Sequence, residues 1–324
     1  MKKIKSLFAF LLIGALVLSL MGCAKEEVVD TSMDIAAETP EAPETPEEPV
    51  VIEKDIVEEG VLAYFANMPE HGYKIKEADL LEKVKANDEM VILDIRSAED
   101  YAKGHVIGAI NVPWGTAISD NITKIPQDKE VFIYCYTGQT AGQAVMTMNL
   151  AGINARSIEF GWNLGISKVE GYEALTDTNA YEFGSDAYEV APEIVAALDS
   201  YYSGLADVGD TIYKFYKISE DDLKALMESD EDFYILSVRK AEDYEKGHID
   251  GAFNIPFTAG MEQQFSILPV GKKVVVYCYT GQTSGQTVAG LRLLGYDAVS
   301  LNAGMGKDKN APAGWANKGY EVVQ

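Results

Sequence analysis

Cysteine and histidine are both scarce in this sequence, which has three of each among its 324 residues. The cysteines Cys23, Cys135 and Cys278 are too few for a disulfide-stapled scaffold or for a multi-cysteine zinc site. A histidine-rich metal site is disfavoured for the same reason. Neither of these two kinds of metal site is therefore expected.

Basic residues are also in short supply. Lysine and arginine number 27 against 51 aspartates and glutamates, which gives a net charge of -24. A strongly negative chain repels the phosphates of nucleic acids and anionic lipid surfaces. We therefore expect no nucleic-acid partner.

A single apolar run near the amino terminus, residues 7–20, follows three lysines and is shorter than the roughly 20 residues of a membrane span. This pattern predicts an export signal over residues 1–22. The run ends in Leu-Met-Gly-Cys, which resembles a bacterial lipobox and implies lipidation of Cys23. The protein would then be extracytoplasmic and would contact the cell membrane through lipidated Cys23 only. An ordinary signal peptide with an incidental cysteine is the alternative.

The stretch from residue 23 to residue 58 is rich in proline and glutamate and lacks an apolar period. Such a stretch cannot bury enough apolar surface to offset the entropy lost on ordering. We expect it to be an extended, self-repelling tether.

An internal repeat organises the rest of the chain. Most of residues 92–113 recurs at 235–256, and residues 134–140 recur unchanged at 277–283, both with a shift of 143 residues. A period this long is typical of a duplicated domain, because solenoid repeats have periods of about 20–50 residues. The expected domains are 59–185 and 186–324.

Each copy alternates between helical and strand-like patterns. The apolar runs have the length of strands that are buried on both faces, as in parallel sheets. Alternating helix and strand predicts an α/β fold in which each domain has a parallel sheet flanked by helices. The expected strands are 90–95, 131–134, 233–238 and 274–277, and the expected helices before the first strand of each copy are 76–85 and 219–228.

Cys135 and Cys278 each fall where a buried strand ends and a helix is expected to begin. Inward-pointing backbone N–H groups and the positive end of a helix both favour a thiolate. Cysteines in such places have pKa values lowered from about 8.5 into the range of roughly 3.5 to 7.5. The same loop would hold an anion or the outer sulfur of a persulfide. The loop residues are Tyr136, Thr137, Gly138, Gln139 and Thr140, and Tyr279, Thr280, Gly281, Gln282 and Thr283.

Two other interpretations of these cysteines are available. In the first, each is an unreactive cysteine buried at a strand end, which is common for this residue type. The loop is identical in both copies while the neighbouring strands differ, which argues against an unreactive cysteine. Alternatively, Cys135 and Cys278 form a structural disulfide, which an exported protein permits. That bond needs the two strand ends to meet, so it is disfavoured.

Two histidines and two arginines recur in the repeat. His105 and His248 lie in Gly-His turns with no nucleophile nearby in the sequence, which favours loop capping over catalysis. Arg96 and Arg239 stand at strand ends just before Ala-Glu-Asp-Tyr. They would brace those acids, the favoured role, or face substrate.

Together, strand-Asp-Ile-Arg, Glu-Asp-Tyr, Gly-His, Asn-(Val/Ile)-Pro and Tyr-Cys-x-x-Gly-x-Thr resemble the rhodanese domain, over residues 70–324. The resemblance implies two tandem rhodanese-like domains. In this family the loop cysteine takes sulfane sulfur from a donor such as thiosulfate, becomes a persulfide, and passes sulfur to a thiol or cyanide acceptor. Cys135 and Cys278 match that sulfur-carrying nucleophile, and the loop residues above match the anion-binding loop.

The sequence departs from many members of that family in two ways. Tyr136 and Thr140 stand where many single-domain members carry a basic residue and an arginine, so the loop has no fixed cation. The missing arginine argues against the related phosphatases, whereas the threonine resembles the two-domain thiosulfate and mercaptopyruvate sulfurtransferases. Both copies also keep the cysteine, whereas familiar two-domain members commonly keep it in the carboxy-terminal copy only.

The favoured hypothesis, which rests on this resemblance, is a lipid-anchored tandem rhodanese that transfers sulfane sulfur through persulfides on Cys135 and Cys278 and needs no metal or organic cofactor. Two rival hypotheses belong to other classes. One is a non-catalytic binding module for a partner or a small sulfur species at the cell envelope. The other is a thiol redox protein that cycles Cys135 with Cys278.

Overall fold

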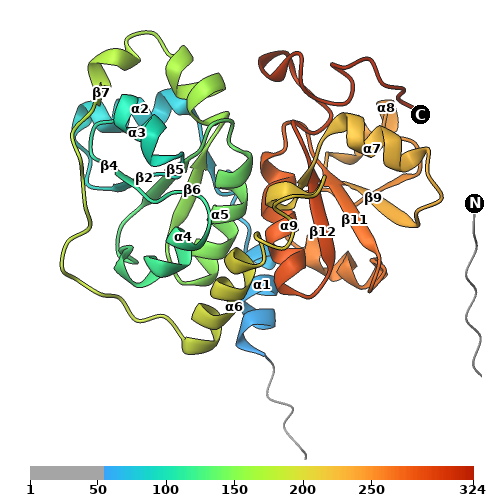
Figure 1. Ribbon diagram of the computed structural model, residues 1–324, viewed down its shortest axis with the longest axis horizontal. Coiled ribbons are helices and arrows are strands. Elements are labelled where there is room, and N and C mark those ends of the chain that lie inside the picture. Colours follow the sequence, from blue (N-terminus) through green and yellow to red (C-terminus); the bar gives the residue numbers. More distant parts are fainter. Residues whose placement is uncertain (1–54) are drawn as a thin grey trace, which may run out of the picture. The chain divides into compact units, whose positions relative to one another are not determined.

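Two five-stranded parallel sheets form the framework of residues 55–324, which are the residues that the computed structural model describes (Figure 1). Their strand orders are equivalent, so the duplication seen in the sequence extends to the topology. The first sheet runs β1 (Lys74–Ile75), β6 (Ala155–Ile158), β5 (Val131–Tyr134), β2 (Val91–Asp94), β4 (Ala109–Asn111), and the second runs β8 (Lys217–Ile218), β12 (Asp297–Leu301), β11 (Lys273–Tyr277), β9 (Phe233–Ser237), β10 (Ala252–Asn254). The predicted α/β class with parallel sheets is confirmed.

The strands predicted from apolar runs are present as β2, β5, β9 and β11. They occupy inner positions of the two sheets and are largely buried. The two predicted helices are α2 (Glu77–Ala86) and α7 (Glu220–Met227). Ser219 caps α7, because its hydroxyl accepts a hydrogen bond from the N–H of Asp222.

Each sheet has an outer face covered by helices of its own repeat. In the first repeat, Leu80 and Leu81 of α2 join one apolar cluster with Phe132 of β5. In the second repeat, Leu223 of α7 joins the equivalent cluster with Val275 of β11. The short helices α3 (Ala98–Lys103) and α8 (Ala241–Lys246) follow β2 and β9.

The inner faces of both sheets share one core. Four helices contribute to it: α1 (Ile56–Ala66), α5 (Gln139–Leu150), α6 (Pro192–Ser203) and α9 (Gln282–Leu293). Helices α5 and α9 pack against each other between the sheets, in the middle of Figure 1. A single cluster of buried apolar residues includes side chains of both sheets, for example Leu93 of the first repeat and Val274 of the second. The described chain is accordingly one compact unit.

The first helix of each repeat also packs on the opposite repeat, and we call this the exchange of helices. Helix α1 packs on the 3-10 helix η6 (Met261–Ile267) of the second repeat, where the Phe65 and Phe265 rings lie 5.2 Å apart. In the other direction, α6 packs on α4 (Thr116–Asp120) of the first repeat. The Tyr202 ring of α6 lies 5.4 Å from the ring of Trp114, which precedes α4. The predicted domain boundary between residues 185 and 186 assigns α6 to the second domain. This helix nevertheless packs on the first repeat.

Two fully buried glutamines make equivalent hydrogen bonds across the interface. Gln286 of α9 accepts from the hydroxyl of Tyr64 at 2.6 Å and donates to the carbonyl of Gly72 at 3.1 Å. Gln143 of α5 accepts from Tyr201 at 2.6 Å and donates to the carbonyl of Phe215 at 3.0 Å. Each glutamine thus satisfies both ends of its amide with groups of the other repeat.

Smaller elements complete the description. The Gly-His segment of the first repeat, β3 (His105–Val106), pairs antiparallel with β7 (Thr176–Asp177), and in the second repeat His248 bridges to Val323. The remaining short helical turns are η1 (Ile122–Lys124), η2 (Gly161–Gly165), η3 (Ile166–Lys168), η4 (Tyr172–Leu175), η5 (Lys214–Tyr216) and η7 (Asp308–Asn310).

The amino-terminal predictions fall mainly outside the described residues. These are the signal over residues 1–22, the lipidation of Cys23 and most of the tether. The end of the tether differs from the prediction, because α1 begins at Ile56, before residue 59. The side chain of Asp55 accepts from the N–H of Val57 and starts the helix there. Within the described part of the chain, no helix has the length and apolar character that crossing a membrane requires.

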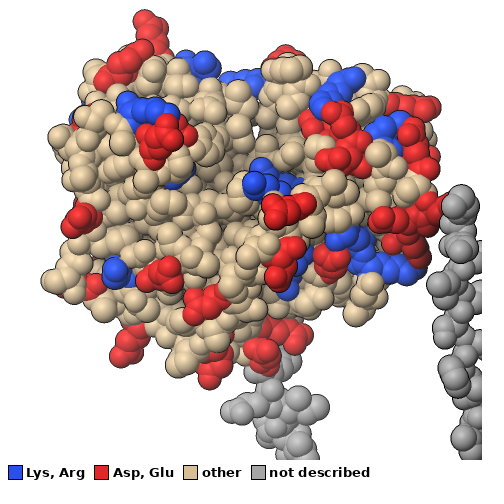
Figure 2. All heavy atoms as spheres, in the orientation of Figure 1, with Lys and Arg blue, Asp and Glu red and all other residues tan. Residues whose placement is uncertain are grey.

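Acidic and basic side chains are interspersed over the face drawn in Figure 2, and neither sign gathers into one broad patch there. Many exposed lysines sit beside carboxylates, for example Lys103 with Glu99 and Asp100 at 2.9 Å. Exposed pairs of this kind contribute little to stability. Stability is therefore expected to depend mainly on the shared core and its buried hydrogen bonds.

We predict that Gln143→Leu destabilises the whole described unit. The substitution leaves the buried Tyr201 hydroxyl and the Phe215 carbonyl without partners, at a cost of about 2–4 kcal/mol in the free energy of unfolding. Gln263→Leu, at an exposed position of η6, is the control and should change it by less than about 0.5 kcal/mol. Urea denaturation measures both, and equal effects would contradict the importance of the buried amide.

Candidate active site

Each repeat places its cysteine at the carboxyl end of a central strand and at the start of an inner helix. Cys135 follows β5 and precedes α5, and Cys278 follows β11 and precedes α9. Both side chains are only 2% exposed, and both are free thiols. The positive ends of α5 and α9 therefore lie beside the sulfur atoms, in an arrangement that favours a thiolate.

The loop after each cysteine curls so that its N–H groups turn toward the sulfur. Gly138 and Gly281 both have φ of +88°, a left-handed conformation that glycine adopts without strain. Their N–H groups each donate to the cysteine Sγ at 3.1 Å, Gly138 to Cys135 and Gly281 to Cys278. This geometry agrees with the anion-binding loop that the sequence predicts.

The loop carbonyls point away from the sulfur, because the segment after the next strand binds them. In the first repeat, Trp162 donates to the Cys135 carbonyl and Asn163 to the Tyr136 carbonyl, both at 2.8 Å. In the second repeat, Met305 donates to the Cys278 carbonyl at 2.8 Å. Gly304, with φ of +57°, passes so close that a Cβ there would overlap this carbonyl.

The loop tyrosines tie each loop to the Glu-Asp-Tyr motif. Tyr136 donates to the Asp100 carboxylate at 2.6 Å, and Tyr279 donates to Asp243 at 2.5 Å. Hydrogen bonds from Tyr136, Lys103 and Ser97 lower the pKa of Asp100 to about 2. The sequence predicts both tyrosines as part of the anion-binding loop, and their contact with substrate stays a prediction. Their hydroxyls fasten the loop to α3 and α8, and the recurrence of tyrosine and aspartate at the same shift was the signal that could have predicted this contact.

The glutamines of the two loops contact the opposite repeat. Gln139 Oε1 accepts from the N–H of Ala303 at 3.3 Å, and Gln282 Nε2 donates to Ser157 Oγ at 2.7 Å. These side chains hold the two loops against each other. Of the loop residues predicted to bind substrate, Gln139 and Gln282 are therefore engaged in the interface between the repeats.

A cavity of about 600 Å³ opens onto Cys278. Its walls come from both repeats, so the first repeat completes the site of the second. The first repeat contributes Met68, Pro69, Glu70, His71, Gly72, Lys74, Glu159 and Phe160, and the second contributes Val238, Lys240, Pro256, Phe257, Thr258, Ala259, Cys278, Tyr279, Thr280, Gln282, Thr283 and Lys307.

The cavity carries cations that the loop itself lacks. Lys74, Lys240 and Lys307 line it, together with the carboxylates of Glu70 and Glu159. Lys74 Nζ lies 3.2 Å from Glu159. Within the described residues, no cluster of three or more His, Cys, Asp or Glu side chains could hold a metal ion.

The two cysteines differ in their hydroxyl neighbours. Burial raises the pKa of Cys278, but hydrogen bonds from the hydroxyls of Ser284 and Thr283 and from loop N–H groups outweigh it, so the pKa is lowered from its ordinary value. Ser284 Oγ lies 3.5 Å from the sulfur and 2.8 Å from Ser300 Oγ. Ala141 stands at the equivalent position beside Cys135.

The arginines predicted to brace acids or to face substrate are buried away from the cavity walls. Arg96 is 3% exposed, binds Asp94 at 2.5 Å and donates to the Gly104 carbonyl at 2.8 Å. Arg239 is 5% exposed and donates to the Gly247 carbonyl. Arg96 therefore braces Asp94, not the predicted acids of the Ala-Glu-Asp-Tyr motif. Contact of either arginine with substrate stays a prediction.

The Gly-His histidines have structural contacts. His105 Nδ1 binds the Tyr101 carbonyl at 2.8 Å, and the two rings stack at 3.6 Å. His248 makes the same contacts with Tyr244, at 3.0 Å and 4.0 Å. The predicted loop-capping role of both histidines is confirmed.

Comparison with protein families gives two matches in this chain. A model described as a rhodanese-like domain matches residues 77–167 and residues 219–311. The first match runs from α2 past β6, and the second runs from the cap of α7 past η7. Both include a loop cysteine and its cradle of N–H groups.

Curated relatives match shorter parts of the chain. Thiosulfate sulfurtransferase PspE of Escherichia coli is 38% identical over 78 residues, which is 24% of this chain and 74% of that protein. YrkF of Bacillus subtilis is 30% identical over 71 residues, 22% of this chain and 38% of that protein. The HTH-type transcriptional regulator Rv0324 of Mycobacterium tuberculosis is 34% identical over 61 residues, 19% and 26% of the two chains. The chain thus spans well under half the length of the last two relatives.

Solved structures include single-domain and longer neighbours. A rhodanese-related protein from Thermoplasma volcanium is 28% identical, with a TM-score of 0.28, and the match covers 33% of this chain and 96% of that chain. SseA from Escherichia coli, described as a 3-mercaptopyruvate sulfotransferase, is 17% identical, with a TM-score of 0.33 and coverage of 71% and 97%.

We predict that Gly304→Ala destabilises the protein and slows the reaction of Cys278 with thiol reagents. Gly251→Ala is the matched control, since its φ of +73° is also left-handed but nothing lies within 4 Å of a Cβ there. The conformation alone costs about 1–2 kcal/mol at either site, and displacement of the Cys278 carbonyl adds about 1–3 kcal/mol at Gly304. Urea denaturation compares the two variants, and equal losses of stability would contradict the close approach.

We predict that Ser284→Ala raises the pKa of Cys278, because the thiolate loses one hydroxyl donor. The pH midpoint of iodoacetamide alkylation should move upward, and below that midpoint the rate should fall about fivefold, as expected for one hydrogen bond of about 1 kcal/mol. The matched variant Ala141→Ser adds a hydroxyl beside Cys135 and should speed its alkylation. An unchanged midpoint in Ser284→Ala would show that this hydroxyl does not bind the thiolate.

Proposed function

Because this chain belongs to the rhodanese-like family and carries the domain twice, we propose that it is a sulfurtransferase acting through persulfides on Cys135 and Cys278. The proposal rests mainly on one observation: each Sγ accepts an N–H bond from its own loop and lies at the start of an inner helix. This environment stabilises negative charge on sulfur in two successive states, the thiolate and the persulfide anion.

The half-reactions follow from that arrangement. The cysteine thiolate attacks the sulfane sulfur of a small donor such as thiosulfate, a new S–S bond forms, and the bond to the sulfonate sulfur breaks. The leaving sulfite carries the bonding electron pair away. A thiolate or cyanide acceptor then attacks the outer sulfur, which restores the cysteine thiolate. No external oxidant, metal or organic cofactor enters either step.

Thiosulfate is proposed as the donor because PspE, a 38% identical relative, is named a thiosulfate sulfurtransferase. A donor of this kind is an anion that approaches a thiolate, so its charge must be offset. At Cys278 the N–H groups of the loop and the lysines of the cavity supply that offset. We propose that Cys278 is loaded more readily than Cys135, since its cavity is open and its pKa is lowered.

We also propose that the protein is anchored outside the cytoplasm by lipid on Cys23. The support is the sequence of residues 1–23, in which an apolar run behind three lysines ends in Leu-Met-Gly-Cys. The folded unit would then stand away from the membrane on the acidic stretch between Cys23 and α1. The acidic charge of the chain disfavours nucleic acid as a partner.

Intact-mass measurement tests both proposals together. The full-length protein is purified from membranes, treated with thiosulfate or with a small persulfide donor, and compared with Cys135→Ser and Cys278→Ser. We expect addition of one sulfur atom per reactive cysteine, its removal by cyanide, and its loss in the matching variant. Lipidation of Cys23 appears in the same spectra as an added acyl mass on a chain that lacks residues 1–22.

The other outcomes separate the rival hypotheses. No sulfur addition with either donor, while both thiols remain free, would rule out sulfur transfer and leave a binding module. A reversible loss of two hydrogen masses that needs both cysteines would instead indicate a redox pair. An unlipidated chain cleaved elsewhere would identify an ordinary export signal.

A further inference from the structure

Both loops lack a fixed positive charge, because Tyr136 and Thr140 and their counterparts in the second repeat are uncharged. The proposed reaction brings an anionic donor to a thiolate, and two like charges a few ångströms apart repel each other strongly inside a protein. The nearest cations of the cavity therefore matter. One of these cations is a lysine of the opposite repeat, and the duplicated sequence has a second lysine at the equivalent position.

Lys74 belongs to the first repeat but lines the cavity of Cys278 in the second. It begins β1, the edge strand of the first sheet that pairs with β6. Its ammonium is paired with Glu159, the residue that follows β6. The second repeat thus receives a lysine from the first.

Lys217 occupies the equivalent position in the second repeat, 143 residues later. It begins β8, the edge strand that pairs with β12. Asn302 stands where the first repeat has Glu159, and no carboxylate of residues 55–324 lies within salt-bridge distance of the Lys217 ammonium. Burial lowers the pKa of Lys217, and the negative charge of a Cys135 thiolate opposes that shift.

Two hydrogen bonds fasten the surroundings of Lys217 to α5, the helix that begins at the Cys135 loop. Gln143 donates to the carbonyl of Phe215, two residues before the lysine, and Gln139 accepts from Ala303 just beyond β12. Phe215 and Tyr216 have φ of +61° and +52°. This conformation is strained for bulky residues, and it turns the chain into β8 where Lys217 begins.

The equivalent contacts exist in the other direction. Gln286 donates to the carbonyl of Gly72, two residues before Lys74, and Gly72 and Tyr73 have φ of +54° and +55°. The same turn, the same glutamine contact and a lysine at the same strand position therefore occur on both sides of the interface. Lys74 lines the cavity of Cys278. Lys217 stands at the equivalent strand position of the second repeat, and a negative charge on Cys135 would raise its pKa against the effect of burial.

We propose that each cysteine takes its anion-binding cation from the opposite repeat, Lys217 serving Cys135 and Lys74 serving Cys278. The inference deepens the proposed sulfur transfer, on which it rests for the identity of the anion. No carboxylate of the described residues lies within salt-bridge distance of Lys217, so no neighbouring acid offsets its attraction for a small anionic donor. Lys74 shares its charge with Glu159 and acts beside Lys240 and Lys307, so its separate contribution is smaller.

The test compares two alkylating reagents of nearly the same size, one anionic and one neutral. Iodoacetate and iodoacetamide react with the same thiolate, so the ratio of their rates measures the charge that the incoming reagent meets. The full-length protein is labelled and the rate at each cysteine is determined by peptide mass. Lys217→Met should lower the iodoacetate-to-iodoacetamide ratio at Cys135 by about tenfold and leave the ratio at Cys278 unchanged. Lys74→Met should lower the ratio at Cys278 by about twofold to threefold and leave Cys135 unchanged.

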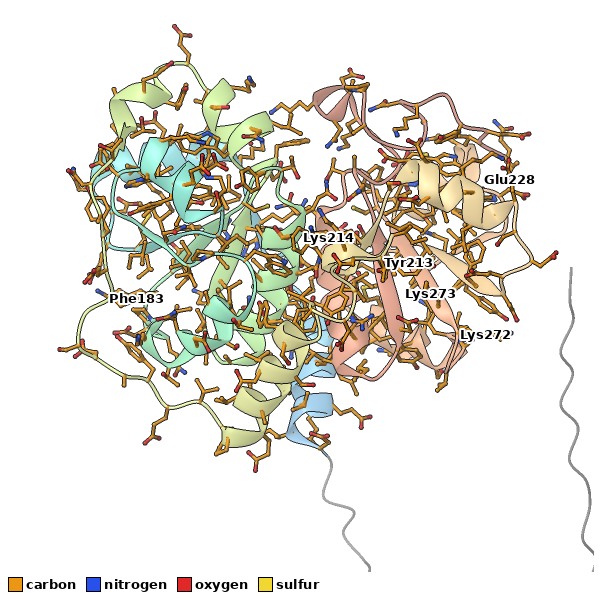
Figure 3. All side chains as sticks on the ribbon, viewed as in Figure 1. Phe183, Tyr213, Lys214, Glu228, Lys272 and Lys273 are labelled. Atoms are coloured by element: carbon orange, nitrogen blue, oxygen red, sulfur yellow. The ribbon has the colours of Figure 1, made fainter. Side chains whose placement is uncertain are left out.

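Two control variants make the result specific. Lys217→Arg keeps the charge and should restore most of the ratio at Cys135. Lys272→Met removes a lysine that is paired with Asp232 and lies at the outer side of the second repeat, where it is labelled in Figure 3. This variant should leave both ratios unchanged.

Each remaining outcome overturns the inference. An unchanged ratio at Cys135 in Lys217→Met would show that the lysine does not face the incoming anion. An equal fall of both rates would indicate a structural role, since a distorted loop slows both reagents alike. No sulfur donor takes part in this experiment, so its failure is distinguishable from failure of the proposed sulfur transfer, which the mass measurement decides separately.

Discussion

A buried amide on each inner helix holds the two repeats in one fixed relation. Gln143 and Gln286 are fully buried, and each binds a tyrosine hydroxyl and a main-chain carbonyl of the opposite repeat. Sliding of α5 along α9 would leave these buried amides without their hydrogen-bond partners. An unpaired buried polar group costs free energy of folding, so such sliding is strongly disfavoured. The loops, the cavity of Cys278 and the edge strands with their lysines all depend on that register.

Duplication has left the two copies with the same loop in different electrostatic surroundings. The five loop residues after each cysteine are unchanged, yet Ser284 faces Cys278 where Ala141 lies beside Cys135, and Glu159 is replaced by Asn302. The Cys278 site therefore has a hydroxyl donor and a lysine that is paired with a carboxylate. The Cys135 site has no such hydroxyl, and its lysine has no carboxylate partner within residues 55–324. Two sites that differ in this way suit different charges on donor and acceptor more readily than two identical sites would.

Local patterns were enough to predict the framework. The buried strands, α2, α7 and the strand-to-helix position of both cysteines follow from apolar runs, capping residues and glycines, which act within a few residues. Exchange of α1 and α6 could not be predicted, because it depends on packing between segments about 200 residues apart in the case of α1 and η6. The partner of Arg96 was also missed: the acids of the Ala-Glu-Asp-Tyr motif were favoured, whereas Arg96 binds Asp94, two residues before it. Lys74 and Lys217 recur at the repeat shift, but the sequence does not indicate that each one faces the other copy.

The exchange of helices has a consequence for biosynthesis. Among the described helices, α1 leaves the ribosome first, and its partner η6 follows about 200 residues later. The side of α1 that packs on η6 therefore stays uncovered until η6 has been made, and contacts this distant in sequence form slowly. A chain built in this way gains from any delay in the folding of its first half, because both halves then begin to fold with all their partners already present.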